Sequence, residues 1–228
     1  MKKKQIVRLS VDTAMTVILL LLMGYSRVGE EAHEWLGIGM TVLFVLHHSL
    51  NQKWIAALFR SRYTAFRTVQ TILVCGIFIG ICISACTGVM LSRHVFRFFG
   101  FETGMAEARE LHLRCGNWNF LLLSVHLGLH WAMIVGMVGK QIKHKSAILK
   151  WLARLLAMGI AVYGVFALLS RNVPAYLFGT IGFSFIDESE PLARFLLDYL
   201  AIMGTFTVLG HYTAKLLRSS RREKNITS

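Results

Sequence analysis

The chain has few of the features that mark nucleotide-dependent or hydrolytic enzymes. Its 228 residues include 2 prolines and 4 cysteines, and only 12 residues are acidic. The cysteines form no CxxC pair and no CxxCH motif, which argues against covalent attachment of a c-type haem. No phosphate-binding glycine loop and no credibly spaced Ser-His-Asp constellation is present. Any chemistry in this chain therefore has to come from other residues.

Charge is also scarce, and apolar residues are abundant. Charged residues make up 16% of the chain and hydrophobic residues 55%, and the mean hydropathy is +0.55. The charges cluster between long apolar runs, which is typical of an integral membrane protein. We predict an all-α fold, an integral membrane helical bundle of about six transmembrane helices. The expected spans are residues 10–28, 33–51, 69–91, 110–138, 148–170 and 192–216.

The net charge of +13 is distributed unevenly along the chain. Most lysines and arginines fall at 2–8, 53–67, 140–154 and 215–224, which alternate spans place on one side. The positive-inside rule makes this side cytoplasmic. We expect a multi-pass protein of the bacterial inner membrane with both termini in the cytoplasm. A basic surface beside anionic membrane lipid explains the charge better than nucleic-acid binding does.

Histidines repeat at one spacing in two of the expected spans. His33 and His47 are 14 positions apart, and so are His112 and His126. On a helix this spacing places both imidazoles on one face, about 21 Å apart, within a hydrocarbon core about 30 Å thick. Spans two and four run in the same direction, so His33 meets His112 near the outer side and His47 meets His126 near the inner side. Because imidazole is a good iron ligand, this pattern indicates two bis-histidine haems.

Two further histidines leave alternatives open. His48 is about 100° from His47 on the helix, and His130 follows His126 by one turn. The positions of the histidines around and along their helices favour His47 and His126 as ligands. His48 or His130 can still replace a predicted ligand. We place His130 at the inner margin, near a haem propionate or a quinone. Asp12, in the first span, is either an interfacial residue or a proton acceptor for a lipid-soluble substrate.

Basic residues mark the outer ends of spans three and four. Arg93 and His94 follow span three, and we expect them to bind the outer cofactor. Arginine pairs well with carboxylates, so any of the outer arginines can contact the haem propionates. The arginines in question are Arg93, Arg97, Arg109 and Arg114.

Several motifs occur together in a set order. They are HEWLG at 33–37, the pair His47 and Asn51, TGxxLSRHVF at 87–96, ARELH at 108–112 and HLGLHW at 126–131. This set resembles the flavinylation-associated membrane cytochromes, which are similar in design to the cytochrome b subunits of hydrogenases and formate dehydrogenases. The resemblance implies haem b at His33, His47, His112 and His126. It also implies electron transfer between the quinone pool and an extracytoplasmic flavin-bearing protein.

The expected function is therefore transmembrane electron transfer, as a cytochrome b subunit of an oxidoreductase system. Residues 1–140 are expected to form the dihaem core and residues 141–228 two additional helices with a basic cytoplasmic tail. One alternative is a self-sufficient membrane oxidoreductase that acts on superoxide or ferric iron. Another is a carrier or scaffold without a cofactor, in which the histidines serve hydrogen bonding or proton transfer.

Overall fold

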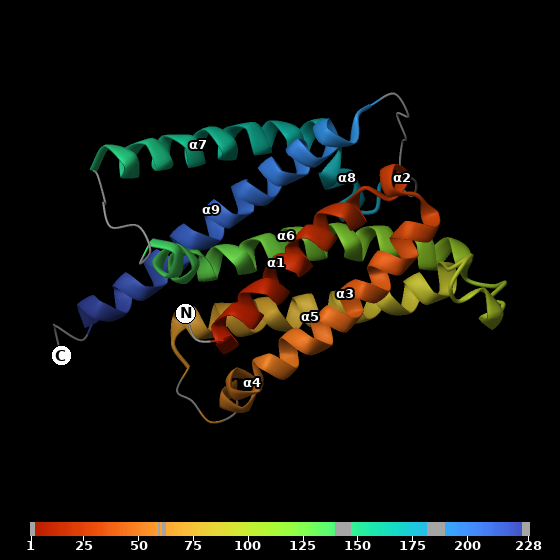
Figure 1. Cartoon of the computed structure of the whole chain (residues 1–228), viewed down its shortest axis with the longest axis horizontal. Coiled ribbons are helices and arrows are strands. Elements are labelled where there is room, and N and C mark those ends of the chain that lie inside the picture. The colour runs from red at the N-terminus through yellow and green to blue at the C-terminus, as the bar shows by residue number, and fades with distance from the viewer. Residues whose placement is uncertain (1–2, 59, 61–62, 140–146, 182–189, 225–228) are drawn as a thin grey trace. The chain divides into compact units, whose positions relative to one another are not determined.

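The structure is a computed structural model that describes residues 3–58, 60, 63–139, 147–181 and 190–224. This described part of the chain is helical and contains no strand, in agreement with the predicted fold class. Figure 1 shows the helices in chain order. Short elements join the long helices: α2 (Tyr25–Val28), α4 (Gln52–Leu58), the 3₁₀ turn η1 (Arg97–Phe99) and α8 (Val173–Leu177).

Among the described residues, five helices are long and apolar enough to cross a membrane. They are α1 (Lys3–Met23), α5 (Ala65–Leu91), α6 (Met105–Gly139), α7 (Ala147–Ser170) and α9 (Leu192–Lys224). The remaining long helix, α3 (Glu30–Leu50), lies where the span 33–51 was expected. It carries three histidines and three glutamates, which lower its hydropathy. A sixth membrane crossing therefore stays a prediction.

Two segment boundaries differ from the sequence prediction. The expected span 10–28 is two helices, because α1 ends at Met23 and α2 follows it. Gly29 then adopts a φ of +87°, a backbone conformation that favours glycine, and α3 begins directly after it. After α3, the residues Gln52–Leu58 form α4, and α5 begins at Ala65.

The chain forms two compact units, each built from three stretches of sequence. Unit 1 contains Met1–Arg62, Gly80–Asn117 and Ala175–Leu196. Unit 2 contains Tyr63–Ile79, Trp118–Pro174 and Leu197–Ser228. The expected boundary at residue 140, between a dihaem core and two additional helices, stays a prediction.

Unit 1 is centred on α1 and α3, which pack along each other (Figure 1). Their contact buries apolar side chains from both helices: Val11, Leu19, Leu20, Met40 and Phe44. Arg8 donates a hydrogen bond to the carbonyl of Leu50, which ties the start of α1 to the end of α3. This packing fixes the histidine-bearing faces of α3 within the unit.

Unit 2 is held together by small residues at helix crossings. A Cβ added at Gly128 of α6 would meet the carbonyl oxygen of Thr207 and the Cα of Gly210, both in α9. A Cβ at Gly164 of α7 would likewise meet the carbonyl oxygen of Ala201. Membrane helices commonly use glycine in this way, because close backbone approach maximises packing.

A buried ion pair also joins α7 to α9 in unit 2. Arg171 donates to Oδ2 of Asp198 through Nε at 2.9 Å and through its terminal nitrogen at 2.6 Å. The hydroxyl of Tyr163 donates to Oδ1 of the same carboxylate at 2.5 Å. Asp198 is only 7% exposed, so both partners are needed to offset the loss of water.

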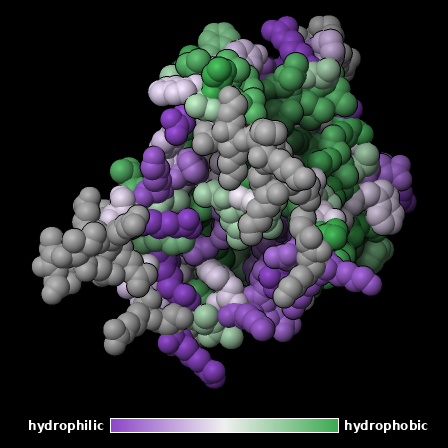
Figure 2. Space-filling model, turned by 60° about the vertical axis from the view of Figure 1, so that its left-hand side comes forward, coloured by the Kyte–Doolittle hydropathy of each residue, from purple (hydrophilic) through white to green (hydrophobic). Residues whose placement is uncertain are grey.

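Large apolar side chains cover much of the surface, as the green regions of Figure 2 show. Helix α7 is an example, with an exposed row of Leu152, Leu155, Leu156, Val162, Phe166 and Leu169. Patches of this extent are not stable in water, whereas lipid accommodates them. The four cysteines, Cys75, Cys82, Cys86 and Cys115, all lie among the described residues and are free thiols.

Candidate functional site

Unit 1 brings two of the predicted ligand histidines together. The ring centroids of His33 in α3 and His112 in α6 are 6.1 Å apart, and their planes are inclined by 65°. Both side chains are partly buried. The ring centroid of Tyr25 lies 5.1 Å from that of His33. His33 and His112 are 79 positions apart in sequence, so only the fold brings them together.

The hydrogen bonds of His112 define which nitrogen is available. Its Nδ1 lies 3.0 Å from the carbonyl oxygen of Ser84 and 3.0 Å from Oγ1 of Thr87. The Thr87 hydroxyl already donates to the carbonyl of Ile83 at 2.8 Å, so Nδ1 of His112 is the donor. A histidine protonated on Nδ1 presents the lone pair of Nε2, the form that binds a metal.

The spacing of the two rings fits a shared metal. A ligating imidazole nitrogen lies about 2 Å from a metal and the ring centroid about 1 Å further, so two imidazoles that shared one metal would have centroids up to about 6 Å apart. The observed 6.1 Å matches this value. In addition, Nδ1 of His33 is buried and has no hydrogen-bond partner in the described part of the chain. A buried nitrogen without a partner is costly, and only a hydrogen bond or a ligand bond to Nδ1 itself would compensate for that cost.

Gly88 lies directly beside the His112 ring. A Cβ added at Gly88 of α5 would lie 3.4 Å from Cε1 and 3.8 Å from Nδ1 of His112. Gly88 directly follows Thr87, so one turn of α5 supplies both the hydrogen-bond acceptor and the room. The TG pair of the TGxxLSRHVF motif thus has a physical role at this histidine.

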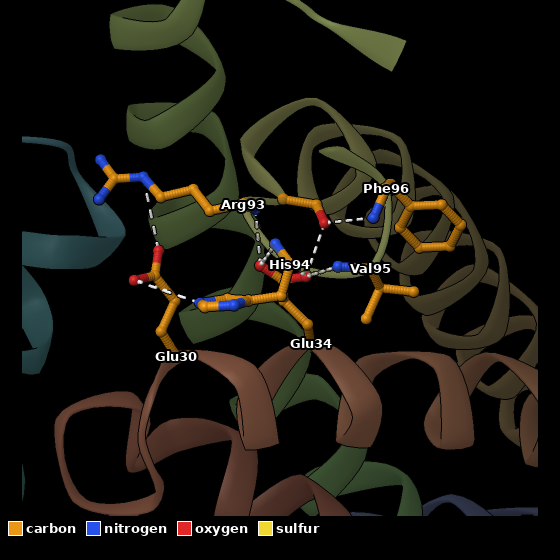
Figure 3. A network of polar contacts seen from close by, with 7 residues as sticks. Glu30, Glu34, Arg93, His94, Val95 and Phe96 are labelled. Atoms are coloured by element: carbon orange, nitrogen blue, oxygen red, sulfur yellow. Dashed lines mark hydrogen bonds and ion pairs between the residues drawn. The ribbon is translucent and has the colours of Figure 1, made fainter. Parts of the chain in front are cut away.

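Glu34 organises the segment that follows α5 (Figure 3). Its carboxylate accepts hydrogen bonds from the backbone N–H groups of Arg93 at 2.8 Å and Val95 at 2.8 Å, and a longer one from His94. The Ser92 hydroxyl donates to the same carboxylate at 2.6 Å. Glu34 follows His33 directly, so this network ties the HEWLG motif to the SRHVF sequence.

The predicted cofactor-binding residues Arg93 and His94 lie at the exposed edge of this network. Nε of Arg93 is 3.5 Å from Glu30, and Nε2 of His94 is 3.9 Å from the other oxygen of Glu30 (Figure 3). One ligand atom each from Glu30, Glu34 and His94 lies within 4.8 Å of the others, a grouping able to hold a metal ion. Since Glu34 already accepts four donors and Arg93 is adjacent, hydrogen bonding and charge pairing account for this group.

His47 also has a defined hydrogen-bond partner in unit 1. Its Nδ1 lies 2.7 Å from Oδ1 of Asp12 in α1, and its Nε2 lies 3.5 Å from the side-chain amide of Asn51. The neighbouring His48 instead contacts the carbonyl oxygen of Phe44, one turn earlier in its own helix, through Nδ1 at 2.9 Å. The Asp12 carboxylate thus orients the imidazole of His47 through Nδ1, and Nε2 faces the amide of Asn51.

The other two histidines lie in unit 2. His126 and His130 of α6 have ring centroids 4.9 Å apart. The side-chain amide of Gln70, which is 7% exposed, lies 3.1 Å from Nε2 of His130 and donates to it. Because His47 belongs to unit 1 and His126 to unit 2, their pairing stays a prediction from sequence.

Four polar residues around the histidines were not identified as partners from the sequence. Glu34, Gln70, Ser84 and Thr87 each form a hydrogen bond that orients a predicted ligand or an adjacent segment. The sequence did contain a signal for these four residues. Each is a polar residue within or beside an apolar helix, where such residues need hydrogen-bond partners. The partner itself depends on helix packing, which no local pattern contains.

No protein-family model, curated protein or solved structure matches this chain. The interpretation of the site therefore depends on its own geometry and on the sequence motifs.

Proposed function

We propose that this protein is a membrane electron-transfer cytochrome that holds two b-type haems between histidines of α3 and α6. The observation that carries the proposal is the approach of His33 and His112, whose ring separation of 6.1 Å suits two axial ligands of one iron. The same two helices provide His47 and His126 for the second haem. When bound, haem supplies reversible one-electron chemistry, and the protein supplies binding, orientation and electrostatics.

The chain's own residues have distinct tasks in this proposal. The carbonyl of Ser84 and the hydroxyl of Thr87 accept hydrogen bonds from the Nδ1–H of His112, which would leave the Nε2 lone pair available to iron. Glu34 fixes the backbone that carries Arg93 and His94, which we assign to the propionates of the outer haem. His130, whose Nε2 lies 3.1 Å from the side-chain amide of Gln70, is assigned to the inner margin.

We further propose that the redox partners are membrane quinone on one side and an extracytoplasmic flavin-bearing protein on the other. This step is supported by the ordered motifs and by the cytoplasmic assignment of the basic segments. The protein would then lie in the bacterial inner membrane with both termini in the cytoplasm.

A haem assay on the purified protein tests the proposal directly. The expected result is two b-type haems per chain, with a reducible absorbance spectrum of low-spin bis-histidine iron. A protein without haem would leave only the carrier or scaffold alternative. Quinol oxidation by the haem-loaded protein, with and without a flavoprotein, then separates an electron-transfer subunit from a self-sufficient oxidoreductase of superoxide or ferric iron.

A further inference from the structure

The two hydrogen-bonded ligand histidines of unit 1 differ in the charge of their partners. Nδ1 of His47 donates to the carboxylate of Asp12 at 2.7 Å. Nδ1 of His112 donates to the carbonyl of Ser84 and the hydroxyl of Thr87, which are both neutral. His47 therefore has a carboxylate hydrogen-bonded to its Nδ1. The outer pair also has a carboxylate nearby, that of Glu34 beside His33, but this group accepts hydrogen bonds from Ser92 and the backbone that follows it.

Asp12 is placed to act on His47 in particular. It lies on α1, a helix without another acidic residue, and α1 packs along α3. The nearby cation on α1, Arg8, donates to the carbonyl of Leu50. The side chain of Asp12 is 49% exposed and that of His47 is 28% exposed, so solvent weakens the interaction without separating the two groups.

A carboxylate behind a ligating imidazole has a predictable effect on the metal. It raises the electron-donating strength of the ligand and adds a negative charge near the iron. Both effects favour ferric over ferrous iron and so lower the reduction potential, for which second-shell hydrogen bonding is a known control. A neutral carbonyl or hydroxyl has a much smaller effect.

We propose that Asp12 is a positioning residue that lowers the reduction potential of the haem bound by His47, and that this haem has the lower potential of the two. The inference rests on the proposed function, because it requires a haem at His47. Asp12 orients the imidazole through Nδ1, and its charge distinguishes the two cofactor sites within one chain.

The test is a spectroelectrochemical redox titration of the haem-loaded full chain. The wild type is expected to show two separate potentials. D12N keeps the size and a hydrogen-bond acceptor but removes the charge. We expect it to raise the lower potential by at least a tenfold change in the ferric-to-ferrous equilibrium, about 59 mV for one electron, and to leave the upper potential unchanged.

Two control variants separate charge from packing. E107Q removes an exposed carboxylate on the first turn of α6 and is expected to move neither potential. D12E keeps the charge, and its two reduction potentials are expected to stay close to those of the wild type. Loss of one haem in D12N but not in D12E would also support the assignment, because charge would then be required to hold the ligand.

Other outcomes would overturn the inference. They are no shift in D12N, a shift of the upper potential instead, equal shifts in D12N and D12E, or loss of haem from both variants. Each of these leaves two haems in the wild type and hence leaves the proposed function intact. A wild-type protein without haem would refute the proposed function itself.

Discussion

The imidazole of His33 lies beside that of His112, with ring centroids 6.1 Å apart, although the two residues belong to different helices. Ser84 and Thr87 of α5 hydrogen-bond to His112, and the Glu34 carboxylate of α3 binds the segment that follows α5. The histidines of this unit are thus held by specific neighbours, and each neighbour offers a test.

Replacing His112 by alanine is expected to remove one haem per chain, because one axial ligand of the outer site is lost. The matched control is H48A, since His48 contacts a carbonyl of its own helix and is not a predicted ligand. The haem-to-protein ratio measures both variants. Equal losses in H112A and H48A would contradict the ligand assignment.

Gly88→Val is expected to weaken haem binding at the same site by about tenfold or more, as changes around ligands often do. A Cβ at this position already lies 3.4 Å from the His112 ring, and the valine methyl groups extend further. Gly159→Val in α7 is the control, because a Cβ at Gly159 also meets nothing within 4 Å. Haem titration of the apoprotein gives the affinities. Similar losses in the two variants would indicate a general effect of valine on the helices.

Glu34→Gln is expected to loosen the segment after α5. The neutral amide replaces a carboxylate that accepts four donors, and a bond to a charged acceptor contributes about 1.5 kcal/mol or more. Amide hydrogen exchange at Arg93–Val95 should become about tenfold faster. Exchange in E31Q, which alters an exposed neighbour, should stay at the wild-type rate.

Gly128→Ala is expected to destabilise unit 2 by about 1–3 kcal/mol, the usual cost of overpacking. The added methyl would contact the backbone of α9 at Thr207 and Gly210, which cannot move aside as a flexible side chain does. Thermal unfolding in detergent measures the effect. Gly136→Ala is the control on the same helix, where a Cβ meets nothing within 4 Å, and it should not lower the melting temperature.

Asp198→Asn is expected to cost about 3 kcal/mol, because it leaves the partly buried guanidinium of Arg171 without its counter-charge. The control is E110Q, which breaks the more exposed pair of Glu110 and Arg114 and should cost less than about 1 kcal/mol. Unfolding measurements on both variants compare the two pairs. Comparable small effects would show that Asp198 does not secure α7 to α9.

The sequence by itself determined the helical class, the apolar runs and the spacing of the four histidines. These follow from composition and from the helical repeat, which are local properties. It also predicted the approach of His33 and His112, because matched spacing on two parallel helices has few geometric solutions. The end of α1 at Met23 was missed, since a glycine between two apolar segments gives only a weak signal.

Only the tertiary structure decided which side chains support the histidines. Asp12 and His47 are 35 positions apart, and Glu34 and Ser92 are 58 apart. Each pair forms because helices pack at one particular rotation and register. That choice depends on the sum of many side-chain contacts across the unit, so it cannot be obtained from the pattern of any single helix.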